Sequence, residues 1–167
     1  MLEIRERVEP EGRERIELTL TLPFDSRQRS RLRVTLGDGT HAALALPRGS
    51  VLRGGDLLRL SDRRVLRVVA AEESVSTARS SAPRALARAA YHLGNRHVPV
   101  EIGEGFVRYL HDHVLDAMVR DLGLSVISEQ TPFEPEGGAY SGGQRAHQHS
   151  HAHGAHAHHG HQHAHDD

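Results

Sequence analysis

Histidine is the residue whose number and spacing stand out in this sequence. Ten of the fifteen histidines lie between residues 147 and 165, most of them alternating with small residues. Neutral imidazole binds nickel, copper and zinc, and it is largely unprotonated at pH 7. A flexible segment with closely spaced histidines can gather several imidazoles around one ion without a preformed cavity. The segment is therefore predicted to bind divalent metal through His147, His149, His151, His153, His156, His158, His159, His161, His163 and His165.

The segment that carries these histidines, residues 134–167, is called the tail below. Beyond Tyr140 it contains no apolar residue larger than Ala, so nothing offsets the entropy of ordering, and we expect disorder without metal. An affinity tag is one alternative, but a tag is usually an uninterrupted run, whereas this one is interleaved with other residues and ends in Asp166-Asp167. Solvated low-complexity filler without a metal role is the other alternative.

One histidine outside the tail is also placed to bind metal. In the stretch Tyr91–Pro99 (YHLGNRHVP), Gly94 is predicted to end a helix, which puts His97 where a loop meets a strand. A histidine on a short loop is exposed and can be oriented, which suits a ligand, although a lone histidine is more often structural. His92 falls in the helical stripe and indicates packing or surface, and His41 is interpreted as incidental.

Composition excludes several classes of protein. Lys and Arg total 21 against 22 for Asp and Glu, so no field of one sign points to nucleic acid or to a membrane surface. The absence of Cys excludes disulfides, Cys-based zinc sites and thiol catalysis. No apolar run approaches the ~18 residues that a membrane span needs. The charged start of the chain lacks the apolar core of a signal peptide, so we expect a cytoplasmic protein.

The histidines must be positioned by two predicted domains of an α+β fold. Residues 1–71 are predicted to form a small all-β domain, since short alternating segments are separated by turn residues and no helix-length periodic run interrupts them. The clearest segments are Arg15–Leu22, Arg31–Leu36, His41–Leu46 and Arg64–Val69.

In residues 72–133 the spacing of apolar residues changes twice between the alternation of a strand and the periodicity of a helix. Strands are predicted at Ser74–Ala78, Val98–Ile102, Phe106–Leu110 and Ser125–Gln130. One helix is expected between a Ser81 cap and Gly94, and a second between an Asp112 cap and Gly123. The order β-α-β-β-α-β is the ferredoxin-like pattern. The tail from residue 134 onward follows as a third region.

The stretch AAYHLGNRHVP resembles the signature of the urease accessory metallochaperone family UreE. Residues 38–60 (DGTHAALALPRGSVLRGGDLLRL) resemble the N-terminal domain of that family, and residues 114–124 (VLDAMVRDLGL) resemble its second helix. Many members also have a histidine-rich tail. The resemblance implies a homodimer that delivers nickel for assembly of the urease active site, together with the urease GTPase partner and the apo-urease complex.

The resemblance also implies particular metal ligands. His97 corresponds to the principal ligand of the family, at the dimer interface. His111 and His113 correspond to a second pair that binds metal in some members. Residues i and i+2 share a face in a strand, so both could reach one ion there, but they diverge in a helix. Glu101 stands where Gln is more common in the family, which places a further carboxylate near the site.

Two other functions compete with nickel delivery. A metallohydrolase would need three protein ligands and a positioned acid or base, and the chain lacks HExxH, a nucleophile elbow and, since it has no Lys, a P-loop lysine. We therefore do not expect an enzyme. A histidine-rich store or buffer of nickel or zinc, without a delivery role, fits the tail equally well but does not require two folded domains. The residues alone indicate metal binding, with Zn²⁺ or Cu²⁺ possible at the same sites, and delivery follows from the resemblance.

Overall fold

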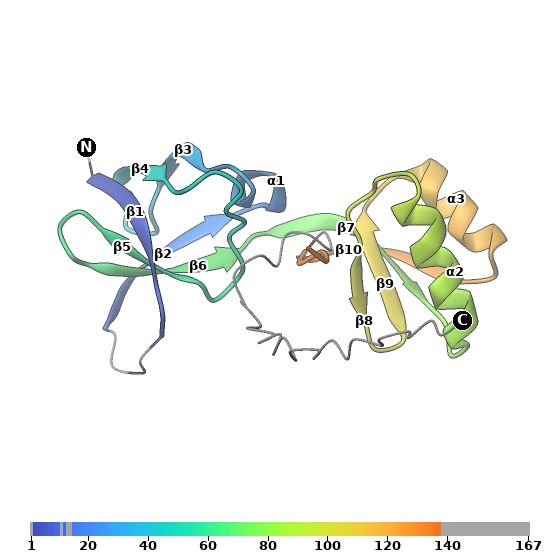
Figure 1. Ribbon diagram of the computed structural model, residues 1–167. Coiled ribbons are helices and arrows are strands. Elements are labelled where there is room, and N and C mark those ends of the chain that lie inside the picture. The colour runs from blue at the N-terminus through green and yellow to red at the C-terminus, as the bar shows by residue number, and fades with distance from the viewer. Residues whose placement is uncertain (1, 11, 13–14, 138–167) are drawn as a thin grey trace, which may run out of the picture.

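The computed structural model describes residues 2–10, 12 and 15–137, which form two β-sheets (Figure 1). All ten histidines of the tail lie outside these described residues, as does nearly all of the segment predicted to be disordered. The mixed α+β class is confirmed, with a strand-rich N-terminal domain followed by a domain of strands and helices.

The first sheet forms the N-terminal domain. Its strands are, in spatial order, β2 (Ile16–Leu22), β6 (Val65–Ala70), β5 (Leu57–Leu60), β1 (Leu2–Val8), β4 (His41–Ala45) and β3 (Arg31–Thr35). Apolar side chains that alternate along these strands fill one core, in which Leu20, Leu44 and Leu66 are almost completely buried. Strand β1 and the one-turn helix α1 (Phe24–Arg27) were not expected from the sequence.

The second sheet has four antiparallel strands in the order β10 (Ser125–Pro132), β7 (Glu72–Arg79), β9 (Phe106–Leu110) and β8 (Glu101–Gly103). Helices α2 (Pro83–Gly94) and α3 (His113–Asp121) cover one face of it (Figure 1). Their apolar stripes pack on the sheet, where Leu93, Tyr109 and Val119 are fully buried. The predicted β-α-β-β-α-β order is confirmed.

Two local expectations in this domain were wrong. Ser81 does not cap α2, since the helix begins at Pro83 after Ala82, which makes no side-chain cap bond. Ser80 Oγ instead accepts a bond from the Ala82 N–H at 3.1 Å. Strand β8 is also shorter than the predicted strand Val98–Ile102, since it begins only at Glu101.

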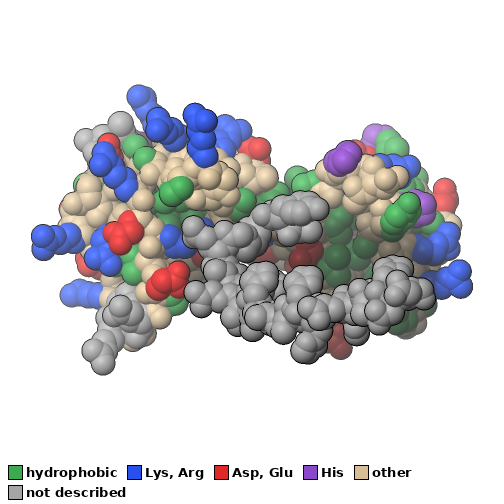
Figure 2. Space-filling view, viewed as in Figure 1, with side chains coloured by type: hydrophobic (Ala, Val, Ile, Leu, Met, Phe, Trp, Pro, Cys, Tyr) green, Lys and Arg blue, Asp and Glu red, His purple; other side chains and the backbone are tan. Residues whose placement is uncertain are grey.

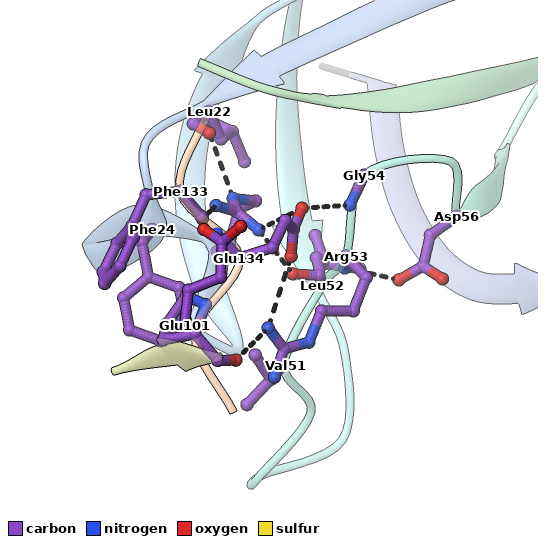
Figure 3. Close-up of polar contacts among 12 residues, drawn as sticks. Leu22, Phe24, Val51, Leu52, Arg53, Gly54, Asp56, Glu101, Phe133 and Glu134 are labelled. Carbon is purple, nitrogen blue, oxygen red and sulfur yellow. Dashed lines mark hydrogen bonds and ion pairs between the residues drawn. The ribbon is translucent and has the colours of Figure 1, made fainter. Parts of the chain in front are cut away.

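The two domains are joined by a buried guanidinium. Arg27 is completely buried and donates to the carbonyl oxygens of Leu22, Leu52 and Phe133. Its Nη1 lies 2.8 Å from the Glu134 Oε1. The Glu134 carboxylate also accepts the Gly54 N–H at 2.7 Å, so the chain leaving β10 is tied to the N-terminal domain (Figure 3).

Very little chain separates the two sheets. Strand β6 ends at Ala70 and β7 begins at Glu72, which leaves Ala71 alone between them. The Ala71 N–H donates to the Leu22 carbonyl at 3.0 Å. The rings of Phe24 and Phe133 meet edge to face, 5.6 Å apart, beside this connection. The connection is therefore fixed by hydrogen bonding and by packing.

Candidate metal centre

His97 lies just beyond α2, in the turn that leads toward β8. The Val98 N–H donates to the Leu93 carbonyl at 3.2 Å, and the His97 N–H donates to the Gly94 carbonyl at 2.9 Å. This pair of bonds is the Schellman arrangement, which closes many helices and places one residue in the left-handed region. His97 is that residue, with φ +57°. Gly94, which was expected to end the helix, is its last residue.

Helix α3 closes in the same way with a glycine. Gly123 has φ +91°, its N–H donates to the Arg120 carbonyl at 2.8 Å, and the Leu124 N–H donates to the Val119 carbonyl at 3.4 Å. A residue with a Cβ is less stable in this region by about 1–2 kcal/mol, a cost that glycine avoids.

The side chain of His97 is exposed, so burial of the imidazole does not offset this strain. Among the described residues other than glycine, only His97 and Arg63 have positive φ. A strained residue that presents its side chain to solvent is a candidate functional position. Arg63 is exposed as well, so the backbone marks both residues, and of the two only His97 has a side chain that binds transition metals.

His111 follows β9 and is held from inside the domain. Its backbone N–H donates to the Ser74 carbonyl at 3.0 Å. The imidazole Nδ1 lies 3.0 Å from the Ser76 Oγ and 3.4 Å from the Asp116 Oδ2. The side chain of His111 is 41% exposed, whereas Ser76 and Asp116 are buried. The ring therefore engages the protein through Nδ1, which leaves Nε2 as the nitrogen available to a metal.

Asp116 is a buried carboxylate on the inner side of α3. The Tyr109 hydroxyl donates to its Oδ1 at 2.9 Å, and Nη2 of Arg120 lies 3.8 Å from its Oδ2. Burial, together with the bond to Asp116, raises the pKa of Tyr109 well above its usual value. The phenol consequently stays protonated at neutral pH and remains a donor to the carboxylate.

His113 is the first residue of α3, and Asp112 caps the helix as expected. The Asp112 carboxylate accepts the N–H groups of Val114 and Leu115 at 2.8 and 3.2 Å. Both bonds lower the pKa of Asp112, and the bond from the Leu115 N–H has the larger effect. Asp112 itself is extended, with φ −150° and ψ 120°, so His111 and His113 flank an extended residue at the start of the helix. Whether both reach one ion stays a prediction.

The remaining candidates have local partners. The ring of His92 meets that of Tyr91 edge to face at 5.3 Å, and the Nδ1 of His41 lies 3.1 Å from the Thr35 Oγ1. Glu101 pairs with Arg108 at 3.0 Å and accepts the Glu134 N–H at 3.0 Å. Its carboxylate therefore links β8 to β9 and to the chain leaving β10.

Ser76, Tyr109 and Asp116 were not identified from the sequence. One signal was available, since Asp116 lies three residues before Val119 on the apolar stripe of α3, where a carboxylate needs a buried partner. Ser76 gave no such signal, because it lies on β7 and reaches His111 only through sheet pairing. Tyr109 gave none either, because its hydroxyl meets Asp116 only when α3 packs on the sheet.

Within residues 2–137, apart from the few left undescribed, no three His, Asp or Glu side chains converge on a point that could hold a metal ion. Figure 2 shows histidine side chains over the C-terminal domain with hydrophobic side chains beside them, while Arg side chains crowd the N-terminal domain. Tyr91 and Val114, which neighbour these histidines in sequence, are 68% and 62% exposed. The described part of one chain thus offers separate, exposed imidazoles that need further ligands to complete a coordination shell. None of its helices is long and apolar enough to cross a membrane.

Comparison with known proteins gives one family over both domains. Residues 4–71 match the family described as UreE urease accessory protein, N-terminal domain, and residues 73–166 match its C-terminal domain. The urease accessory protein UreE of Alkalilimnicola ehrlichii is 62% identical over 126 residues, which cover 75% of this chain and 77% of that protein. Those of Pseudomonas putida (strain GB-1) and Citrobacter koseri are 53% and 50% identical over 148 residues, which cover 88% of this chain and 90% and 96% of those proteins. The chain therefore belongs to the UreE family of urease accessory proteins.

Proposed function

We propose that this protein binds Ni²⁺ and delivers it for assembly of the urease active site. Nickel chaperoning in urease maturation is the function of the UreE family, which consists of accessory proteins and not of enzymes. The structural observation that supports a role in metal transfer is the exposed His97, kept in a strained left-handed conformation at the end of α2. A storage protein without a delivery role would not require this feature or the family's two domains.

The tight site is proposed to form between two copies of the chain. One imidazole cannot hold nickel tightly, and the described part of a single chain brings no three donors together. A two-fold interface would place two copies of His97 side by side, because an isologous interface brings identical residues together. The exposed Tyr91 and Val114 supply apolar surface for such a contact. His111, His113 or the tails would complete the coordination shell.

The tail is proposed to gather metal for this site. Its many imidazoles also suit Zn²⁺ and Cu²⁺, and copper should bind most tightly, so selection of nickel depends on metal availability and on partners. The proposed partners are the urease GTPase and the apo-urease complex, and the proposed location is the cytoplasm. The proposed division into residues 1–71, 72–133 and 134–167 assigns these roles to separate parts of the chain.

Native mass spectrometry of the protein without residues 146–167 tests the bridging site. We expect about half an equivalent of tight nickel per chain, because two chains share one ion. His97→Ala should abolish this binding and leave the dimer intact, whereas the control His92→Ala should keep both. One full equivalent per chain, or tight binding retained in His97→Ala, would refute the bridging site.

Delivery is separated from storage by a transfer assay. Nickel-loaded protein is mixed with apo-urease complex, the GTPase and GTP, in the presence of a chelator that captures free nickel. A delivery protein activates urease under these conditions, because the ion passes directly between proteins. If the chelator suppressed activation as fully as it does with free nickel, the protein would be a store.

A further inference from the structure

We propose that Asp116, with Ser76, fixes the tautomer of His111 so that the Nε2 lone pair points to solvent as a ligand for a divalent transition metal. The inference rests on the proposed nickel function and assigns positioning roles to two buried residues that do not themselves bind metal. It applies to His111 and not to His113, since no side-chain bond to the His113 ring is seen in the described part of the chain.

The direction of the hydrogen bonds follows from the buried carboxylate. Carboxylate oxygens are hydrogen-bond acceptors, so the groups that face Asp116 are favoured as donors. The Tyr109 hydroxyl donates to its Oδ1 at 2.9 Å. The His111 Nδ1 lies 3.0 Å from the Ser76 Oγ, its hydrogen-bond partner, and 3.4 Å from the Asp116 Oδ2. A proton on Nδ1 is favoured there, because a lone pair would face the carboxylate oxygen and be repelled by it.

The same contacts hold the plane of the ring. Ser76 lies on β7 and Asp116 on α3, so the imidazole is contacted from two elements that pack in one core. Both groups are buried, at 0% and 3% exposure, and cannot exchange their bonds for water. With Nδ1–H directed inward, the neutral ring offers only Nε2 to a metal. A carboxylate behind a ligating histidine also raises the basicity of the ligand.

Asp116→Asn tests the inference, because it preserves shape but replaces an acceptor by an amide that can donate. The tautomer of His111 is read from the imidazole nitrogen shifts of the full-length, metal-free protein, assigned by comparison with His111→Gln. We expect Nδ1–H in the wild type and a shift toward Nε2–H in Asp116→Asn. Tyr109→Phe is the matched control, since it also removes a buried bond but keeps the carboxylate, so its tautomer should not change.

Nickel provides the second readout. Paramagnetic broadening of the His111 signals should require about tenfold more nickel in Asp116→Asn than in the wild type. Broadening of the tail histidines should be equal in the two proteins, which keeps this test separate from the proposed function as a whole. If Asp116→Asn unfolds, Ser76→Ala serves instead, with a smaller change in the same direction. An unchanged tautomer in the folded variant, or equal nickel response at His111, would overturn the inference.

Discussion

Replacing His97 by glycine is expected to stabilise the protein while removing its proposed principal ligand. The left-handed conformation at residue 97 costs a residue with a Cβ about 1–2 kcal/mol. Glycine avoids that cost but loses about 0.4–1 kcal/mol through the greater freedom of the unfolded chain. The net gain in the free energy of unfolding is therefore about 0.5–1 kcal/mol, or about 1–4 °C in Tm for a protein of this size.

Gly123 supplies the reverse control. It closes α3 with φ +91°, and a Cβ added there would meet no atom within 4 Å, so Gly123→Ala tests conformation without a clash. That substitution should lower the free energy of unfolding by a similar amount. His92→Gly, inside α2, should also destabilise, by about 0.5 kcal/mol.

The assay is thermal and urea denaturation of the metal-free protein in the presence of a chelator, with unfolding monitored by circular dichroism. Metal must be absent because nickel bound to His97 would stabilise the wild type selectively. If His97→Gly melted at or below the wild-type temperature while Gly123→Ala behaved as expected, the imidazole of His97 would have to make stabilising contacts. The left-handed conformation of His97 would then have a structural explanation and would not indicate a functional role.

Three further outcomes are expected. Arg27→Met should lower the free energy of unfolding by about 3 kcal/mol or more in denaturant titrations, because it leaves three carbonyl groups and the Glu134 carboxylate without their buried donor; a loss below about 1 kcal/mol would contradict this. Deleting residues 146–167 should remove several bound metal ions per chain, counted by mass spectrometry, and retain a cooperative thermal transition. Metal capacity of the full chain should fall mostly between about pH 7 and 5, because free imidazole has a pKa near 6.5 and protonation displaces the metal. Capacity that stayed flat to about pH 4 would indicate carboxylate ligands instead.

The order of elements in the C-terminal domain could be predicted because each element has a characteristic spacing of apolar residues and is bounded by capping or turn residues. Asp112 and Gly123 mark the ends of α3 in the sequence, and the structure uses both. Strand β1 could not be found in this way. Its pairing with β5 is interrupted by a bulge between Ile4 and Glu6, so a charged residue falls where alternation requires an apolar one.

The candidate site, too, could be predicted from the sequence only where local residues determine it. His97 could be proposed from the sequence, because a histidine after Gly94-Asn95 must lie in a connecting loop. Its left-handed conformation could not, since glycine is the residue usually expected there. The partners of His111 were also beyond local reasoning, because Ser76 is 35 residues away and arrives through the pairing of β7 with β9.

The one-residue connection between the two sheets constrains how another protein can contact both domains. The Ala71 N–H is bonded to the Leu22 carbonyl, and Arg27 ties Phe133 and Glu134, in the chain that leaves β10, to the N-terminal domain. Both segments that pass between the two sheets are therefore held by polar contacts. A protein that contacts both domains would meet the six-stranded sheet and the His97 turn in the relative positions that these contacts favour.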